Sequence, residues 1–181
     1  MRVKNTDSDY GIITILFHWS IALLIIGLIV SGLTMTSLPN NLGKLTLFGL
    51  HKQFGLLVLL IVILRLFWRL FNKIPALPRT MPKWQVISAH ISHYLLYILM
   101  FTLPITGWLL TSAAGFPVSF FKLFIWPVVG RPNEKLEQIY TQTHDWLGIA
   151  LTFVVVVHIG AALMHHFIDR DNVLRRMLPW N

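Results

Sequence analysis

Four long runs of apolar residues dominate the 181-residue sequence and limit what the chain can fold into. They cover about residues 12–35, 45–70, 86–111 and 145–168. About 20 apolar residues in an α-helix cross the roughly 30 Å hydrocarbon core of a bilayer, so each run is long enough to span a membrane. The sequence therefore predicts an all-α integral membrane four-helix bundle, with residues 1–181 in a single membrane domain.

The composition agrees with a membrane protein and excludes several other classes. Hydrophobic residues make up 55% of the chain and charged residues 12%, far from the balance of a soluble domain. Cysteine is absent, which excludes disulfides, iron–sulfur clusters and haem attached through cysteine. The net charge is +8, but the basic residues lie in connectors between apolar runs. We interpret them as topology signals and expect membrane lipid, not nucleic acid, as a partner.

The distribution of lysine and arginine predicts the orientation of the chain. Two such residues precede the first run, four lie in the connector 66–85 and three in the tail 169–181. The other side carries one in residues 36–46 and three in the longer segment 112–142. Because cytoplasmic flanks carry the excess, both termini are expected in the cytoplasm. The aromatic-rich segment between the third and fourth helices is expected to form a periplasmic cap at the membrane interface.

Four histidines lie within or at the edges of the apolar runs: His18, His51, His144 and His158. Ionisable residues are rare inside membrane spans and usually mark a functional site. His18 and His158 lie at similar depths near the cytoplasmic side. His51 and His144 lie near the periplasmic side. Each pair is therefore expected to meet across two facing helices.

The spacing of His144 and His158 is the strongest of these signals. They are fourteen residues apart, which at about 100° and 1.5 Å per residue places them within ~40° of one helix face and ~21 Å apart. Imidazoles from two facing helices can bind the iron of b-type haem. We therefore expect two haem b groups, one held by His18 and His158 and one by His51 and His144.

Two different roles for these histidines stay open. Each one taken alone can be a helix-packing residue that hydrogen-bonds to a neighbour. A metal-ion transporter can also use intramembrane histidines, but it usually adds carboxylates. The core has none, since no acidic residue occurs between Asp9 and Glu134.

Four further histidines, His90, His93, His165 and His166, lie near the cytoplasmic ends of the third and fourth runs. Interfacial snorkelling accounts for their positions, and so does a functional role. His165 is the main rival of His158 as an axial ligand, because it lies seven residues further along the same helix face. It would stretch the spacing to His144 to ~31 Å, the full thickness of the hydrocarbon core, so we favour His158. Snorkelling is also our interpretation of Arg65 and Arg69.

Several motifs give the chain a resemblance to the bacterial cytochrome b561 family of small di-haem membrane proteins. They are F-H-W at 17–19, G-L-H at 49–51, A-H-x-x-H-x-x-x-Y at 89–97, L-P-I-x-G at 103–107, His144-Asp145, His158 and H-H-F-x-x-x-D-x-x-L-R-R-M at 165–177. The resemblance covers nearly the whole chain and is weakest in residues 112–140. It implies a four-helix bundle in the bacterial inner membrane, two b haems on the same four histidines, and electron exchange with ubiquinone.

The hypothesis for the mechanism is a quinone-linked oxidoreductase. Electrons enter at the periplasmic haem, cross to the cytoplasmic haem and reduce quinone. Quinone needs an apolar slot with a hydrogen-bond or proton donor, for which His90, His93, His165 and His166 are candidates.

The electron donor has two candidate classes. Basic residues at the periplasmic mouth would stabilise haem propionates and attract a small anion such as superoxide, although lipid headgroup contact accounts for them equally well. These residues are Lys44, Lys52, Lys122, Arg131 and Lys135. The alternative is a membrane anchor that relays electrons for a periplasmic dehydrogenase or hydrogenase, a redox protein that would dock on residues 112–140.

Overall fold

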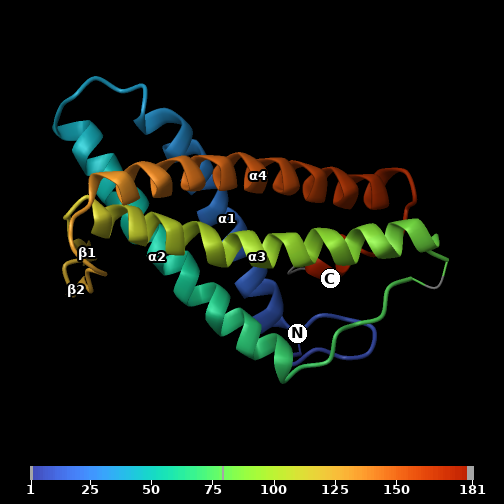
Figure 1. Cartoon of the computed structure of the whole chain (residues 1–181). Helices are drawn as coiled ribbons and strands as arrows, with labels where there is room; N and C mark the ends of the chain where they lie inside the picture. Colours follow the sequence, from blue (N-terminus) through green and yellow to red (C-terminus); the bar gives the residue numbers. More distant parts are fainter. Residues whose placement is uncertain (1, 79, 179–181) are drawn as a thin grey trace.

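The computed structural model describes residues 2–78 and 80–178, which form four long helices and a small hairpin (Figure 1). The helices are α1 (Ile12–Met35), α2 (Leu42–Leu70), α3 (Lys83–Ala113) and α4 (Glu134–Phe167). Strands β1 (Val118–Phe120) and β2 (Phe124–Trp126) lie between α3 and α4, and a 3₁₀ turn, η1 (Arg175–Met177), follows α4. Arg79, one of the four basic residues of the connector 66–85, lies outside the described residues.

All four helices are long and apolar enough to cross a membrane. Their most apolar windows have mean hydropathies of 2.5, 2.1, 1.6 and 2.4, from α1 to α4. Large apolar side chains point outward from the bundle, for example Leu23, Phe153 and Val156, which are 69%, 69% and 63% exposed. So much apolar surface suits lipid as the solvent, not water. The predicted all-α four-helix membrane bundle is confirmed.

Two helices begin with side-chain caps. The Asn41 side chain accepts a hydrogen bond from the Lys44 amide at the start of α2, and Asn133 accepts one from the Leu136 amide at the start of α4. Such caps satisfy amides that have no partner within the helix. Together with Glu134 in its first turn, the Asn133 cap starts α4 well before its apolar run. The fourth helix therefore projects beyond its membrane-crossing part.

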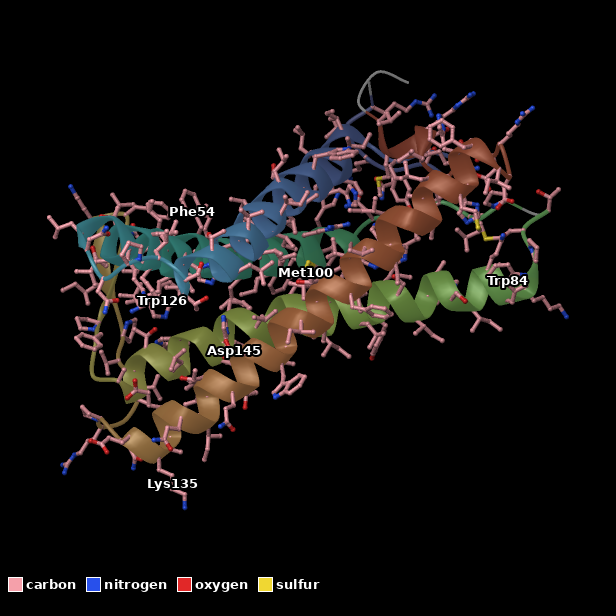
Figure 2. The ribbon with its side chains drawn as sticks, turned by 90° about the horizontal axis from the view of Figure 1, so that it is seen from above. Phe54, Trp84, Met100, Trp126, Lys135 and Asp145 are labelled. Atoms are coloured by element: carbon pink, nitrogen blue, oxygen red, sulfur yellow. The ribbon has the colours of Figure 1, made fainter. Side chains whose placement is uncertain are left out.

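The helices pack unequally. α3 runs beside α4, while α1 packs on α2 and α2 on α3 (Figure 1). In the described part of the chain, α4 makes no comparably close backbone contact with α1 or α2. An apolar core fills the middle of the bundle, where Met100 is labelled in Figure 2. It consists of Ile21, Ile25, Val58, Val62, Leu99, Met100 and Leu151.

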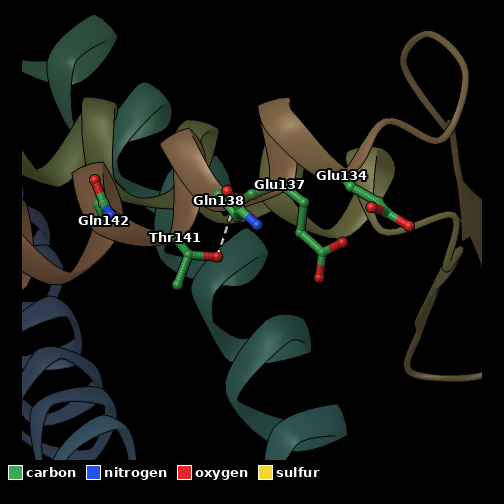
Figure 3. Close-up of a pocket in the computed structure, with 5 residues that line it drawn as sticks. All are labelled: Glu134, Glu137, Gln138, Thr141 and Gln142. Carbon is green, nitrogen blue, oxygen red and sulfur yellow. Dashed lines mark hydrogen bonds between the residues drawn. The ribbon is translucent and has the colours of Figure 1, made fainter.

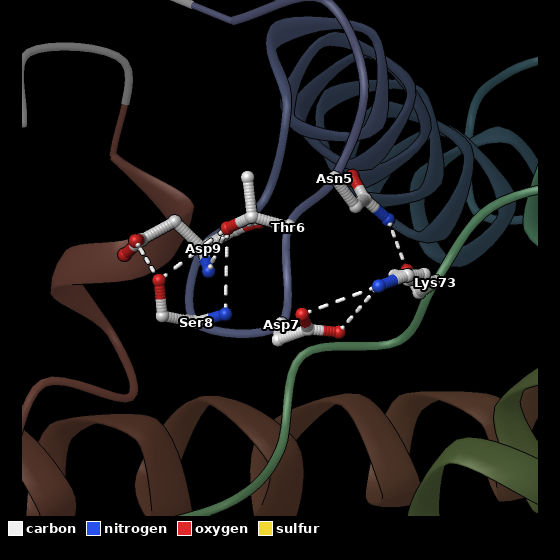
Figure 4. A network of polar contacts seen from close by, with 6 residues as sticks. All are labelled: Asn5, Thr6, Asp7, Ser8, Asp9 and Lys73. Carbon is white, nitrogen blue, oxygen red and sulfur yellow. Dashed lines mark hydrogen bonds and ion pairs between the residues drawn. The ribbon is translucent and has the colours of Figure 1, made fainter.

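We call the two ends of the bundle the terminal end and the hairpin end. The terminal end contains both chain termini and the α2–α3 connector, and the hairpin end contains the α1–α2 loop and the strands (Figure 1). Trp84 and Lys135 mark these ends of the α3–α4 pair in Figure 2. At the terminal end, Lys73 Nζ lies 2.9 Å from the Asp7 carboxylate, and the Asn5 amide donates to the Lys73 carbonyl at 2.7 Å (Figure 4). These contacts join the N-terminal segment to the connector.

The segment expected to form an interfacial cap contains an antiparallel hairpin that was not predicted. Val118 pairs with Trp126, and Phe121 and Lys122 form the turn with positive φ angles of 49° and 62°. The loop between the strands has three residues, 121–123, and two successive positive φ angles of this kind usually require Asn or Gly. Neither residue type occurs in this turn, so the sequence lacked the usual hairpin signal.

The hairpin is attached to α2 and α3. Gln53 of α2 accepts a hydrogen bond from the Phe121 amide at 3.0 Å, and Phe120 packs against Leu56. Trp108 of α3 donates from Nε1 to the Pro127 carbonyl at 2.7 Å. The hairpin therefore packs against the first half of α2, at one end of the bundle.

Candidate functional site

The structure brings the four central histidines together as two pairs, one toward each end of the bundle. The ring centroids of His18 on α1 and His158 on α4 are 6.2 Å apart. Those of His51 on α2 and His144 on α4 are 6.3 Å apart. All four side chains are half-buried. Each pair joins α4 to a helix whose backbone stays apart from it.

At the hairpin end, a backbone carbonyl orients His144. Its Nδ1 lies 3.1 Å from the Leu103 carbonyl and 3.2 Å from Thr106 Oγ1, whose own hydroxyl donates to Leu103. A carbonyl only accepts hydrogen bonds, so Nδ1 of His144 carries the hydrogen. Nε2 then keeps a free lone pair, which is the form in which histidine binds metals.

His51 is oriented in the same way by a hydroxyl. The Ser31 hydroxyl donates to the Leu28 carbonyl at 3.0 Å, so its oxygen accepts from His51 Nδ1 at 2.9 Å. His51 therefore also has a free Nε2. Metal-binding histidines almost always donate their other N–H to an oxygen, which sets the tautomer and ring orientation. Both histidines at the hairpin end meet this condition.

The terminal-end pair has different surroundings. Arg65 Nη2 lies 3.4 Å from His18 Nδ1, and the rings of His93 and His158 are 5.5 Å apart. Within residues 2–78 and 80–178, neither His18 nor His158 hydrogen-bonds to a carbonyl or hydroxyl oxygen. A cation, not an oxygen acceptor, is thus the polar neighbour of this pair.

The other candidate histidines separate into distinct classes. His165 is only 7% exposed, with Nδ1 2.7 Å from Asp171 and 3.3 Å from Asp169. It is therefore not an interfacial snorkelling residue. His90 is exposed, and its Nδ1 lies 2.6 Å from the Val86 carbonyl of its own helix.

The last two candidates differ in what surrounds them. His93 is exposed on α3 and contacts His158. The Nδ1 atom of His166 is buried and has no hydrogen-bond partner among the described residues. Of the four histidines outside the two pairs, His93 is the one that is both exposed and in contact with a histidine of a pair.

The basic residues expected at the periplasmic mouth lie near the hairpin end, in several settings. Lys52 follows His51 on α2, is half-buried, and places Nζ 5.9 Å from the Phe116 ring centroid. Lys44 donates to the Leu38 carbonyl at 3.0 Å and so closes the α1–α2 loop. Lys122 lies in the hairpin turn.

Carboxylates also occur at this end. A surface pocket on the first turns of α4 is lined by Glu134, Glu137, Gln138, Thr141 and Gln142 (Figure 3). The hairpin end therefore carries both signs of charge, with the lysine nearest the histidine pair on α2. We assign no ligand to the acidic pocket.

Comparison with known proteins identifies the family. The family described as prokaryotic cytochrome b561 matches residues 9–180. The chain belongs to this family. It is 34% identical over 180 residues to cytochrome b561 homolog 2 of Escherichia coli (strain K12), covering 98% of this chain and 95% of the relative.

Two other relatives extend the comparison. Cytochrome b561 homolog 1 of the same strain is 33% identical over 130 residues, covering 71% of this chain and 73% of the relative. The probable superoxide oxidase CybB of Yersinia pestis is 29% identical over 171 residues, covering 94% and 96%. As a cytochrome b561, the chain is a multi-pass bacterial membrane protein that carries electrons by haem b.

The residues present fit haem at both histidine pairs. Metal–nitrogen bonds to imidazole are about 2.0–2.1 Å long, so two rings that share one metal have centroids up to roughly 6.5 Å apart. The observed 6.2 and 6.3 Å agree with this. Glycine also gives room beside the rings, because a Cβ on Gly107 would lie 3.1 Å from His144 Cε1 and one on Gly32 3.4 Å from His51 Cε1.

Sequence reasoning missed the residues that orient these histidines. Ser31 and Thr106 are hydroxyl residues in apolar helices, which bond so often to their own helix that they carry no specific signal. Arg65 was interpreted as snorkelling, but it contacts His18. The absence of any acidic residue between Asp9 and Glu134 was the one available clue that Arg65 needs another partner.

Proposed function

We propose that this cytochrome b561 holds two haem b groups and carries electrons from a donor at the hairpin end to ubiquinone at the terminal end. His18 with His158 would bind one iron, and His51 with His144 the other. Haem b supplies reversible one-electron oxidation and reduction. The observation that carries the proposal is the pair of imidazole separations, 6.2 and 6.3 Å, at two levels of one helix.

The proposed orientation places the hairpin end in the periplasm and both termini in the cytoplasm of the bacterial inner membrane. The lysine and arginine excess in the N-terminal segment, the α2–α3 connector and the tail supports it. These three segments lie together at the terminal end (Figure 1). Quinone reduction would then draw protons from the cytoplasmic side.

Superoxide is the donor that we propose. Lys52, half-buried next to His51, would attract a small anion and stabilise a haem propionate at the hairpin end. The name of the Yersinia pestis relative, probable superoxide oxidase, supports this choice. In a balanced reaction, two superoxide ions each lose one electron to give O₂, and ubiquinone takes up the two electrons and two protons.

Stopped-flow spectroscopy of the purified protein tests this function. We expect two reducible b-type haems per chain, reduced by superoxide and reoxidised by ubiquinone. A colourless protein would contradict the haem assignment. Reduced haems that ubiquinone does not reoxidise would contradict the quinone assignment. Reduction only by a periplasmic redox protein that covers residues 112–140 would favour the anchor alternative.

His93 is the residue that we propose for hydrogen bonding to quinone. It is exposed on α3, and its ring centroid lies 5.5 Å from that of His158. The buried His165 instead contacts the carboxylates of Asp171 and Asp169. A quinone arriving through the lipid would meet His93 beside the terminal-end pair.

Substitution of His93 by phenylalanine is expected to slow quinone reduction on the order of 10²-fold, the lower range for loss of a proton donor. The ring volume is kept, so the haem content should not change. His90→Phe is the matched control on the same helix, and its rate should stay within about twofold, as expected for a surface change. The measurement is ubiquinol formation in proteoliposomes, and equal rates for both variants would exclude His93.

Substitution of Gly107 by valine is expected to remove the hairpin-end haem. Its side chain would push against His144, whose Cε1 lies 3.1 Å from a Cβ at this position. The haem content should fall from two per chain toward one, as measured by the pyridine haemochromogen spectrum. Gly49→Val is the control, because a Cβ there meets only the Gln53 side chain, at 3.9 Å, which is an ordinary van der Waals contact. Two haems in Gly107→Val would show that His144 has room to move.

A further inference from the structure

The polar cluster beside the terminal-end histidines has no counter-ion. Arg65 and Arg69 both lie on α2, one helical turn apart, and each places its guanidinium 5.8 Å from the Tyr97 ring centroid. Two like charges thus share one aromatic ring. Within the described residues, no carboxylate pairs with either arginine: Asp7 pairs with Lys73, and Asp169 and Asp171 pair with His165.

An unneutralised arginine in this position is costly. Arg65 is half-buried between α1 and α3, in a helix that crosses the membrane. Charged groups inside membranes are nearly always paired, because hydrocarbon does not solvate them. Neither α2 nor α3 contains an acidic residue. The missing negative charge must come from outside these helices.

Tyr10 does not supply this charge. It lies just before α1, close enough for electrostatic interaction with Arg69, Arg176 and Arg65. Burial raises the pKa of the Tyr10 hydroxyl above its usual value, and this outweighs the opposing effect of the arginines. Tyr10 therefore stays neutral at physiological pH.

The contact with His18 also points to a missing acceptor. A guanidinium has only N–H donors, so Arg65 donates here to an unprotonated Nδ1 at 3.4 Å. A histidine that binds iron through Nε2 carries its hydrogen on Nδ1. Arg65 would then face a donor at this ring, and the Tyr97 side chain, to which it also hydrogen-bonds, offers a hydroxyl and not a carboxylate. Haem brings two carboxylates of its own.

We infer that Arg65, with Arg69 beside it, binds a propionate carboxylate of the haem held by His18 and His158, and thereby raises the reduction potential of that haem. The inference rests on the proposed function. Reduction adds one negative charge to the haem, and a neighbouring guanidinium stabilises that charge. The hairpin-end histidines instead donate to oxygens, which makes them more basic and favours the oxidised iron. The two surroundings together would make the terminal-end haem the better electron acceptor.

Spectroscopic redox titration of the holoprotein tests this inference. In Arg65→Gln, the equilibrium for reduction of one haem should fall at least tenfold, a decrease of about 59 mV for a one-electron couple. The reduction potential of the other haem should change by less than this amount. Arg65→Lys keeps the charge and should recover at least half of the shift. Lys73→Gln removes an exposed charge at the same end of the bundle and should change neither haem.

The source of the carboxylate or phosphate that binds Arg65 needs a separate measurement. A lipid headgroup would make the difference between wild type and Arg65→Gln depend on anionic lipid, so both proteins are titrated in nanodiscs of phosphatidylcholine with and without phosphatidylglycerol. A propionate gives the same difference in both. Redox-difference infrared spectra with ¹³C-labelled propionates should show the carboxylate band of wild type shifted in Arg65→Lys. That band also provides the test if Arg65→Gln does not fold.

The outcomes separate this inference from the proposed function. The inference alone would be overturned if both haems bind normally and neither their reduction potentials nor the carboxylate bands change on substitution of Arg65. It would also be overturned if the difference between wild type and Arg65→Gln depends on anionic lipid. Wild-type protein with fewer than two haems would contradict the proposed function itself.

Discussion

Substitution of His158 by leucine is expected to lower the haem content from two groups per chain to one. Leucine cannot bind iron, and the imidazole that remains on His18 would hold the haem from one side only. The oriented histidines at the hairpin end lie elsewhere on the bundle, and their haem should stay. The measurement is the haem-to-protein ratio, with the spectrum and potential of the remaining haem compared with those of the hairpin-end haem in wild type.

The matched control is His166→Leu, which removes an imidazole from the same helix without touching either pair. It should keep two haems. The double variant His144→Leu with His158→Leu should have none, because α4 supplies one ligand to each site. Retention of both haems in His158→Leu would mean that another histidine, such as His93 at 5.5 Å from His158, is the ligand.

Substitution of His51 by leucine is expected to abolish electron entry from the hairpin end while leaving the terminal-end haem in place. Electrons would have to reach the terminal-end site across the bundle without an intermediate carrier. The decrease in the rate of superoxide-driven reduction should exceed the roughly 10–100-fold effect that is typical of changes around metal ligands. Superoxide-driven reduction is followed by stopped-flow, and reduction of the remaining haem by ubiquinol serves as the internal reference.

Ser31→Ala is the graded companion of this variant. It keeps His51 but removes the oxygen that accepts from its Nδ1 at 2.9 Å. Both haems should remain, and only the hairpin-end haem should change its reduction potential. Unimpaired superoxide-driven reduction in His51→Leu would show that electrons enter elsewhere, and the donor proposal would be wrong.

The four-helix membrane bundle was predictable because hydropathy acts locally along the chain. Each apolar run contains enough residues to cross the bilayer, whatever its neighbours are. α1 begins and ends at the residues expected, Ile12 and Met35, because a polar segment and a proline-containing loop flank it. The hairpin at Val118–Trp126 was not predictable, because its turn lacks glycine and is held from outside by Gln53 of α2.

The candidate histidines were also named from sequence alone, and their assignment as ligands stays a prediction. Helical spacing relates His144 and His158 directly, since both lie on one helix. Their partners could be expected only from matching depth. The ring separations of 6.2 and 6.3 Å depend on how α1 and α2 lie relative to α4.

What the sequence alone determined is therefore the membrane class, the number of helices and the supply of imidazoles, all of which follow from residue type and local spacing. The tertiary structure decided what surrounds each imidazole. It placed Ser31 and the Leu103 carbonyl at the hairpin-end pair and Arg65 at the other. These contacts join different helices, so their distances follow from packing and not from any spacing along the chain.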